Sequence, residues 1–319
     1  MRTCLVTGGA GFIGSHLTDA LLKDGWNVRV LDDFSTGRRA NLPDVSRDVE
    51  IVEGDLRHPA AAHRAAKGCE VVFHLGALGS VPRSVENPVL THEVNVTGSV
   101  NVLTAARDAG ARRVVVASSS SVYGDAPDAV KREEGLGNPL SPYAVSKRAM
   151  ELYGQVFALR YGFEVVALRY FNVFGPRQDP DAAYTAVVPR FFRAALRGTR
   201  PVIHGDGEQT RDFTFVADVV EASLRASAAA VPGGFLVSNV ALGGRVTVNR
   251  LWRAIAGLTG AAEPAAQPEY RPPRPGDVLH ASASTERLRG WLGWAPAISL
   301  EEGLDRSVAF YRARLEVEK

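Results

Sequence analysis

Hydrophobic and polar positions divide the first half of the chain into two kinds of segment that alternate. Short apolar runs, typical of buried strands, lie at residues 3–8, 27–32, 49–56, 70–76, 112–119 and 164–175. Segments with apolar residues at helical spacing lie at 13–25, 97–110 and 143–161. Because strands alternate with helices, we expect an α/β fold whose parallel sheet carries helices on both faces.

The second half of the chain has a less regular pattern. It predicts helices at 187–198, 218–230 and 249–260, a strand at 234–242 and a hairpin-like segment at 201–216. The proline-rich stretch 263–277 is either a solvated linker or an extended arm over a site, where Arg271 and Arg274 would supply cations on a stiff backbone.

Composition and charge narrow the range of functions. A formal net charge of +2 over 319 residues implies no broad basic surface for nucleic acid. No apolar run is long enough to span a membrane, and the N-terminus lacks the apolar stretch of a signal peptide. Cys4 and Cys69 show no metal-ligand spacing and are expected to be reduced core thiols of a cytoplasmic protein.

The sequence TGGAGFIGSHL follows the first strand and opens the first helix. Gly8 permits a tight turn, Gly11 lets the backbone approach a pyrophosphate, and Gly14 lets helix and strand pack closely. The free N–H groups of the helix start, at Phe12 and Ile13, favour phosphate binding. This combination is typical of a Rossmann-type dinucleotide site.

Two acidic residues follow later strands of the same predicted site. Asp32 ends the second strand, where it can accept hydrogen bonds from both ribose hydroxyls and repel a 2′-phosphate. The cofactor should therefore be NAD, a preference that the nearby Arg38 and Arg39 weaken slightly. Asp55, with Leu56 beside it, either contacts the adenine or caps a loop.

A tyrosine and a lysine one helical turn apart lie in SPYAVSKRAMELY. Ser141 and Pro142 are typical of a helix start, so Tyr143 and Lys147 should share one face of that helix. A free tyrosine has a pKa of about 10 and is a poor base at neutral pH. A neighbouring ammonium lowers that pKa, which lets the phenol take a proton from an alcohol beside NAD.

Four serines, residues 118–121, end the fifth strand. Ligands bind at the carboxyl ends of strands in open α/β sheets. A hydroxyl at this place can hydrogen-bond the reacting oxygen and share its proton with Tyr143, although a plain serine-rich turn would have the same sequence.

These residues resemble those of the extended short-chain dehydrogenase/reductase family, in its nucleotide-sugar 4-epimerase branch. The motifs match in order over nearly the whole chain, and the pattern is closest to enzymes of UDP-glucose and UDP-N-acetylglucosamine. They are TGGAGFIGSHL, HLGALGSVPRS, ASSSSVYG, SPYAVSK, RYFNVFGPRQDP, GDGEQTRDF and RPGDV.

The resemblance implies a role for each matching residue. Tyr143 is the base, Lys147 its partner, and Ser119 the hydroxyl that contacts O4 of the sugar, with Ser120 beside it. The remaining matches are substrate contacts: Asn172 contacts the sugar nucleotide, Arg211 and Arg274 grip the diphosphate, and Asp277 bonds a ribose.

The resemblance also implies a reaction and an architecture. A UDP-hexose is oxidised at C4 by tightly bound NAD, turns about its diphosphate, and is reduced on its other face. The expected NAD-binding domain spans residues 1–175, with a return of the chain around 213–241, and a smaller mixed α/β substrate domain spans 176–319. Helices around 90–109 and 143–161 resemble a dimer-forming four-helix bundle, although their apolar faces could equally be core.

Residue size near C2 of the sugar bears on the choice of substrate. Relatives restricted to the smaller sugar have a tyrosine where this chain has Ala281, and the loop with Gly79 and Ser80 resembles that of relatives which accept an acetamide. We therefore expect activity on both sugars. The sequence leaves open whether the base is uracil or thymine.

Three rival functions share parts of this pattern. A 4,6-dehydratase carries an acidic pair where this chain has Ser120 and Ser121. An enzyme of UDP-glucuronate would need a cation near C5, whereas this chain has Asp179 in the corresponding loop. A non-catalytic NAD sensor would need neither Tyr143 nor Lys147.

Overall fold

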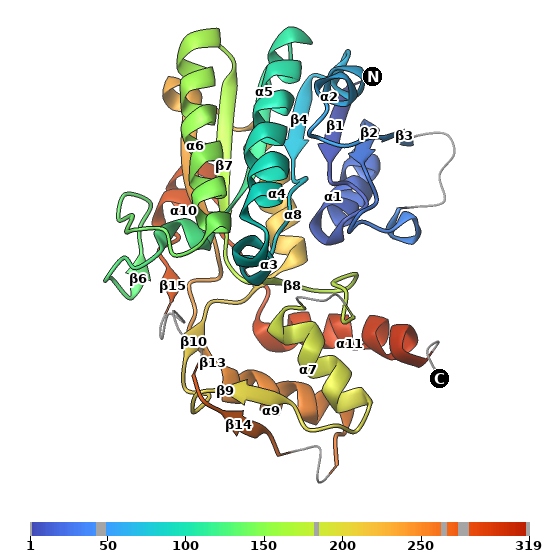
Figure 1. Ribbon diagram of the computed structural model, residues 1–319, viewed down its shortest axis with the longest axis vertical. Coiled ribbons are helices and arrows are strands. Elements are labelled where there is room, and N and C mark those ends of the chain that lie inside the picture. The colour runs from blue at the N-terminus through green and yellow to red at the C-terminus, as the bar shows by residue number, and fades with distance from the viewer. Residues whose placement is uncertain (1, 43–48, 182–184, 263–266, 274–280, 317–319) are drawn as a thin grey trace.

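A seven-stranded parallel sheet forms the centre of the protein (Figure 1). The computed structural model describes residues 2–42, 49–181, 185–262, 267–273 and 281–316. The strand order is β12-β7-β5-β4-β1-β2-β3, so the chain starts in the middle of the sheet and winds outward twice. This confirms the Rossmann-type fold, whose switch point lies between β1 and β4. The strands are β1 (Thr3–Thr7), β2 (Asn27–Asp32), β3 (Val49–Glu53), β4 (Val71–His74), β5 (Arg113–Ser119), β7 (Glu164–Tyr170) and β12 (Phe235–Val240).

Helices cover both faces of the sheet because successive strand residues point to opposite sides. Val6 of β1 packs in the layer that contains Leu17 of α1, whereas its neighbour Leu5 packs in the layer that contains Leu103 of α5. The helices of the first layer are α1 (Phe12–Lys23) and α8 (Val216–Ala228); those of the second are α2 (Pro59–Ala66), α5 (Gly98–Asp108) and α6 (Pro142–Tyr161).

Helix α6 begins and ends where its sequence predicts. The hydroxyl of Ser141 accepts a hydrogen bond of 3.1 Å from the Ala144 amide, and Pro142 occupies the first turn. The helix ends at Gly162, which has φ +72°. Both signals fix where α6 begins and ends, and therefore place Tyr143 and Lys147 in its first two turns.

The chain returns to the sheet late in the sequence. Strand β12 pairs with β7 in parallel register from Phe235↔Val165 to Val240↔Tyr170, and α8 packs against α1. The division into an NAD-binding domain and a substrate domain stays a prediction.

The lower part of Figure 1 consists of helices and short strands. The helices are α7 (Val187–Leu196), α9 (Val248–Thr259) and α11 (Leu300–Glu316). The short strands pair as β8 (Val173–Phe174) with β11 (Thr214–Phe215), β9 (Val202–His204) with β14 (Glu269–Arg271), and β10 (Thr210–Arg211) with β13 (Val246–Thr247).

The predicted hairpin at 201–216 is wrong. Strands β9, β10 and β11 all lie in this segment, yet none pairs with another. Each pairs instead with a strand outside the segment, before it or well after it in the sequence. The local hydrophobic pattern cannot reveal such a pairing. The proline-rich stretch contributes β14, so its described part belongs to a strand pair, while residues 263–266 and 274–277 lie outside the described residues.

Several elements were not predicted. They are α3 (Val81–Glu86), α10 (Glu286–Leu292), α2, α11, and the paired strands β6 (Val130–Lys131) and β15 (Ser282–Ala283). The helix expected around 90–109 is present as the end of α4 (Pro88–His92), a π-helical turn at Glu93–Thr97 and α5. In α11, the buried residues Leu304, Ser307, Tyr311 and Leu315 recur at helical spacing, a signal that could have found this helix.

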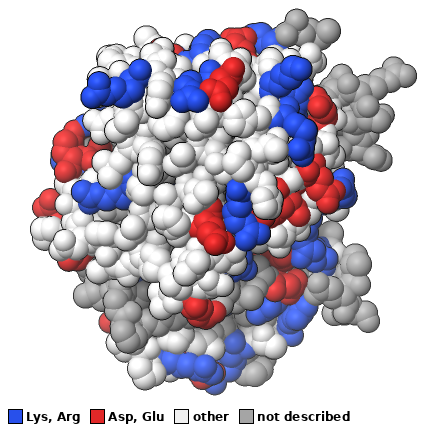
Figure 2. Space-filling view, turned by 45° about the horizontal axis from the view of Figure 1, so that its top comes forward, with Lys and Arg blue, Asp and Glu red and all other residues white. Residues whose placement is uncertain are grey.

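The two cysteines are buried, and charges of both signs are mixed on the surface. Cys4 and Cys69 are both buried and unpaired. On the face seen in Figure 2, acidic and basic side chains are interleaved and separated by uncharged surface. None of the helices in the described part of the chain is long and apolar enough to cross a membrane.

Candidate active site

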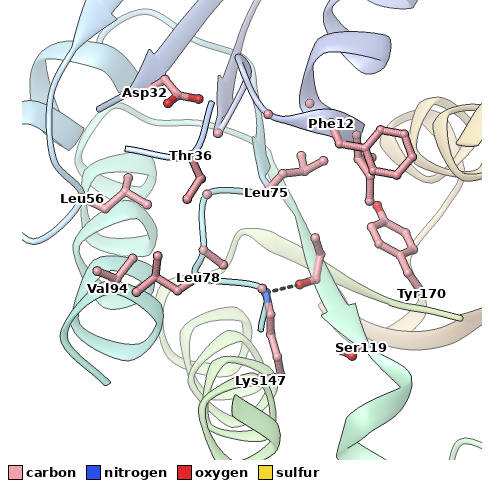
Figure 3. Close-up of a pocket in the computed structure, with 18 of the residues that line it drawn as sticks. Phe12, Asp32, Thr36, Leu56, Leu75, Leu78, Val94, Ser119, Lys147 and Tyr170 are labelled. Carbon is pink, nitrogen blue, oxygen red and sulfur yellow. Dashed lines mark hydrogen bonds between the residues drawn. The ribbon is translucent and has the colours of Figure 1, made fainter. Parts of the chain in front are cut away.

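A cavity of about 510 Å³ lies at the carboxyl ends of the central strands (Figure 3). Its size is within the range of small-molecule sites. The strands deliver their ends to one edge of the sheet, so residues far apart in sequence meet there. Fourteen of the predicted site residues line it: Gly8, Gly11, Phe12, Ile13, Gly14, Asp32, Asp55, Leu56, Gly79, Ser119, Ser120, Tyr143, Lys147 and Asn172.

The glycine-rich turn between β1 and α1 has no space for side chains. Gly8 has φ +68°, and a Cβ there would lie 2.8 Å from the Cα of Gly76. A Cβ on Gly14 would lie 2.1 Å from the carbonyl oxygen of Gly8. Helix α1 has Gly11 at its start without a side-chain cap, so amides of its first turn remain available to a phosphate.

Asp32 at the end of β2 is held by backbone amides. Its two carboxylate oxygens accept hydrogen bonds of 2.9 Å from Ala10 and Phe34. Burial raises the pKa of this carboxyl, and the two amides oppose that effect. A carboxylate has about four acceptor positions, so two remain for hydroxyl groups entering the cavity.

Asp55, which follows β3, is engaged by its neighbour Arg57. The Arg57 amide and Nε each donate a hydrogen bond of 2.8 Å to the Asp55 carboxylate, and this pairing lowers the pKa of Asp55. Asp55 therefore both closes a local turn and lines the cavity with Leu56, so the two sequence interpretations are compatible.

Tyr143 and Lys147 project from the first turns of α6 into the cavity. The Lys147 Nζ lies 5.9 Å from the centre of the Tyr143 ring and donates a hydrogen bond of 2.7 Å to the carbonyl oxygen of Ala117, at the end of β5 (Figure 3). The lysine is thereby fixed between the tyrosine and the strand end.

Burial affects the ionisation of both groups. Burial raises the pKa of Tyr143, and a hydrogen bond with Ser119 only partly opposes this, so the lowering of this pKa by Lys147 together with the nicotinamide charge stays a prediction. Burial lowers the pKa of Lys147 to about 8, although the charge of Glu151 acts in the opposite direction. For both side chains desolvation is the largest cause of the shift in pKa.

Ser119 ends β5, and its hydroxyl is already within a local hydrogen-bond set. Its Oγ accepts from the amide of Ser121 at 3.2 Å and from the Ser121 hydroxyl at 2.9 Å. Together with its hydrogen bond to Tyr143, these contacts keep Ser119 pointing into the cavity beside Ser120.

Predicted substrate contacts are divided between the cavity and its surroundings. Asn172 lines the cavity with an unusual φ of +29°, and its Nδ2 donates to the Asp212 carbonyl at 3.0 Å. Ser80 is not among the cavity-lining residues; its hydroxyl caps α3 by accepting from the Arg83 amide.

Arg211 and Ala281 also lie outside the cavity lining, and they are neighbours. The carbonyl oxygen of Thr210 accepts hydrogen bonds from Arg211 Nη1 at 2.9 Å and from the Ala281 amide at 3.4 Å. The other two predicted contacts, Arg274 and Asp277, lie outside the described residues.

Sequence reasoning missed Asn95, one of the residues that support the cavity wall. Asn95, in the π-helical turn, accepts from the Leu78 amide at 2.8 Å and donates to Ser146 at 3.0 Å, which fixes the loop at 76–79. His74 is buried between Thr7 and Ser99 and has its pKa lowered to about 3 by burial, so it is a neutral structural group. No periodic signal marks Asn95, because its partners lie on other elements.

The cavity fits NAD. The glycine turn leaves backbone amides beside an open space, Asp32 has acceptor positions for two ribose hydroxyls, and both belong to the same wall. Within the described residues, no three acidic, histidine or cysteine side chains are grouped as metal ligands.

The model of the NAD dependent epimerase/dehydratase family matches residues 4–240. A UDP-glucose 4-epimerase of Mycolicibacterium smegmatis is 43% identical over 98% of this chain and 99% of its own. UDP-glucuronic acid decarboxylase 1 of Xenopus tropicalis is 34% identical over 99% of this chain and 73% of its own.

A solved structure is similar to this chain over nearly its whole length. It is a UDP-N-acetylglucosamine 4-epimerase from Methanobrevibacter ruminantium, in complex with UDP-N-acetylmuramic acid. The TM-score is 0.92 at 38% identity, covering 98% of this chain and 99% of that one. The matching family model, the identity with curated enzymes and the shared fold agree with the expected extended short-chain dehydrogenase/reductase, an enzyme that uses NAD. The chain belongs to the NAD dependent epimerase/dehydratase family.

Proposed function

We propose that the protein inverts the configuration at C4 of a UDP-hexose through a transient 4-keto sugar. The observation that carries this proposal is the meeting of Tyr143, Lys147 and Ser119 in the cavity that the glycine turn closes. Such a set can remove a proton from a sugar hydroxyl beside a dinucleotide.

The chain's own residues divide the proton transfer between them. Tyr143 takes the proton of the 4-hydroxyl, while Ser119 holds the reacting oxygen through its hydroxyl. Bound NAD would supply a hydride acceptor for C4, a hydride donor for the return step and a positive charge in the site. Lys147 adds a second positive charge, so the phenolate of Tyr143 is favoured once the cation and substrate fill the cavity.

Inversion requires a loosely held sugar on a firmly held nucleotide. Arg211 and Arg274 are the proposed diphosphate ligands, because a guanidinium matches two phosphate oxygens at once. Asn172 is the proposed sugar contact and Asp277 the proposed ribose contact. Proton return from Tyr143 to the turned keto sugar then completes the reaction.

We infer that both UDP-N-acetylglucosamine and UDP-glucose are substrates. The small side chain of Ala281 leaves space near the acetamide, and Gly79 and Ser80 are the proposed contacts of that group. Similarity to an enzyme named for each sugar supports this breadth.

The test is chromatography of a panel of UDP-sugars incubated with purified protein and no added NAD. We expect interconversion of UDP-glucose with UDP-galactose and of their N-acetyl counterparts. Conversion without added cofactor would also show that NAD stays bound during purification. No conversion of any UDP-hexose, with or without added NAD, contradicts the proposal.

A second candidate is a reaction of UDP-glucuronate, which similarity to a decarboxylase of that substrate supports. The sequence argument against it was the negative charge of Asp179. In the structure Asp179 pairs with Arg38, across the loops that follow β8 and β2, so its charge is balanced and the argument is weaker. Incubation with UDP-glucuronate, followed for the C4 epimer and for CO2, separates this candidate from the first.

We also infer a homodimer. Exposed apolar residues lie on neighbouring helices and would be buried by a second copy. They are Val81, Val85 and Val89 on α3 and α4, and Val145, Leu152, Val156 and Leu159 on α6. Sedimentation of the protein and of Leu159→Glu tests this, since only the variant should be monomeric. The unpaired buried cysteines fit a reducing, cytoplasmic compartment.

A further inference from the structure

A buried ion pair lies one helical turn beyond Lys147. Glu151 of α6 accepts two hydrogen bonds from Arg169 of β7, from Nε at 2.9 Å and from Nη2 at 2.8 Å. Their side chains are only 7% and 3% exposed. A buried pair of this kind seldom adds net stability over apolar residues, so its presence beside a reaction site calls for another explanation.

Glu151 also binds the strand that carries Ser119. The hydroxyl of Ser118, next to it in β5, donates a hydrogen bond to the Glu151 carboxylate. Helix α6 is thereby tied to three consecutive residues at the end of β5. Tyr143 is bonded to Ser119, Lys147 to the carbonyl of Ala117, and Glu151 to Ser118.

Arg169 is itself fixed, which makes Glu151 a rigid anchor. Its Nη1 donates to the hydroxyl of Tyr123 at 3.1 Å and to the carbonyl oxygen of Glu133 at 2.8 Å. Tyr123 in turn donates to Asn239 of β12. The carboxylate of Glu151 therefore cannot turn away from Ser118 without breaking several buried hydrogen bonds.

We propose that Glu151, anchored by Arg169, is a positioning residue that holds the end of β5 so that Ser119 stays in register with Tyr143. This rests on the proposed function, in which both hydroxyls contact the reacting oxygen. A small displacement of Ser119 would separate its hydroxyl from that of Tyr143, although both must contact the reacting oxygen at the same time.

The charge of Glu151 gives this role a second, electrostatic part. Four ionisable groups surround the Lys147 ammonium: Tyr143 and Glu151 on α6, His74 at the end of β4 and, behind Glu151, Arg169 on β7. His74 is neutral and Arg169 opposes the ammonium, so the Glu151 carboxylate is the one anion among them. It favours the protonated form of Lys147 against burial.

Ser118→Ala tests the positioning role while leaving the ion pair intact. We expect kcat to fall ~10-fold, because a misplaced group costs catalysis more than binding, with KM for the UDP-sugar and NAD content unchanged. Ser307→Ala is the matched control. Ser307 is also a buried serine, but its hydroxyl donates to Gly303 within α11, far along the chain from the site, and its removal should leave kcat unchanged.

Amide hydrogen exchange supplies a readout that needs no activity. In Ser118→Ala the amides of residues 117–121 should exchange faster than in wild type, and in Ser307→Ala they should not. Unchanged exchange at the end of β5 overturns the proposal, even if kcat falls, because Ser118 would then not be holding the strand. If the wild-type protein converts no UDP-sugar, the proposed function fails. The exchange comparison still decides whether Glu151 holds the end of β5 through Ser118.

Glu151→Gln tests the electrostatic part through the pH profile of kcat/KM. Loss of the anion should move the alkaline limb, set by Lys147, to lower pH. A merely structural role lowers the rate and leaves the limb in place, and that result overturns the assignment. Because Glu151→Gln leaves Arg169 buried without its partner, the same measurements are made on Glu151→Leu/Arg169→Met, which removes both charges and should show a smaller shift in the same direction.

Discussion

The edge of the central sheet and the region around the short strands β10, β13 and β15 are built differently. At the sheet edge, Asp32, Lys147 and Glu151 are buried and each is bound to backbone or to a partner on another element. In the other region, strands of only two residues pair with each other, and Arg211 and Ala281 donate to one carbonyl oxygen.

The difference separates the proposed chemistry from the proposed recognition. Groups that move a proton must be held within a fraction of an ångström, and a parallel sheet with packed helices can do so. Short strand pairs tolerate substitution more easily, so sugar preference can change there without disturbing the proton transfer. The predictions below test whether the two regions are separable in this way.

Among changes at the edge of the central sheet, Tyr143→Phe should have the largest effect on activity. Removal of the proposed base should lower kcat ~1,000-fold, because general base catalysis contributes about that much. NAD content, measured after denaturation, should be unchanged. Tyr161→Phe, at the exposed far end of α6, is the control and should retain wild-type kcat. A protein that only senses NAD would be indifferent to both.

Gly14→Ala should damage the glycine turn itself. Its Cβ would lie 2.1 Å from the Gly8 carbonyl oxygen, so the turn must distort. We expect a loss of about 3 kcal/mol in the free energy of unfolding, measured in urea. Gly257→Ala, inside α9 with open space around its Cβ, should instead gain about 0.5 kcal/mol. Equal stability of the two variants would contradict the close packing.

Ala281→Tyr should change sugar preference alone, because Ala281 lies in the region around β10, β13 and β15. A bulky ring should depress kcat/KM for UDP-N-acetylglucosamine ~50-fold and leave UDP-glucose nearly unaffected, because only the former carries the acetamide. Ala281→Ser keeps the side chain small and should preserve both activities. An equal loss on the two sugars would show that the regions are coupled.

Lys147 should set an alkaline limit on activity. Its pKa is lowered to about 8 by burial, and the protonated form is the one that supports the phenolate. The favourable charge is present below that pKa and is lost above it, so kcat/KM should fall about tenfold per pH unit on the alkaline side. Lys147→Arg, which stays charged, should be slower but lack this limb. A limb that persists in the variant belongs to another group.

The sequence was informative where the relevant interactions are local. The glycine turn, the capped start of α6 and the Tyr143–Lys147 spacing each occupy one short stretch, and the residues they place are found together in the cavity. Parallel strands with intervening helices also have a strong periodic pattern, so the fold was predictable.

Prediction failed where the partner is far away in the chain. The hairpin at 201–216 was wrong because β9 pairs with β14 (Glu269–Arg271), which lies far beyond this segment in the chain. The pKa of Tyr143 depends on how deeply the cavity buries it, which no spacing reveals. No sequence signal marks the ion pair of Glu151 and Arg169, because its two members lie on α6 and β7 and meet only in the folded protein.

The apolar core has a consequence for dividing the molecule. Leu17 of α1 and Val219 of α8 belong to the same continuous cluster as Phe191, Trp252 and Tyr311 of the lower helices. A protease cut or a deletion that removes the C-terminal third would expose to water the apolar surfaces that pack against these aromatic residues. We therefore expect neither fragment to fold stably alone.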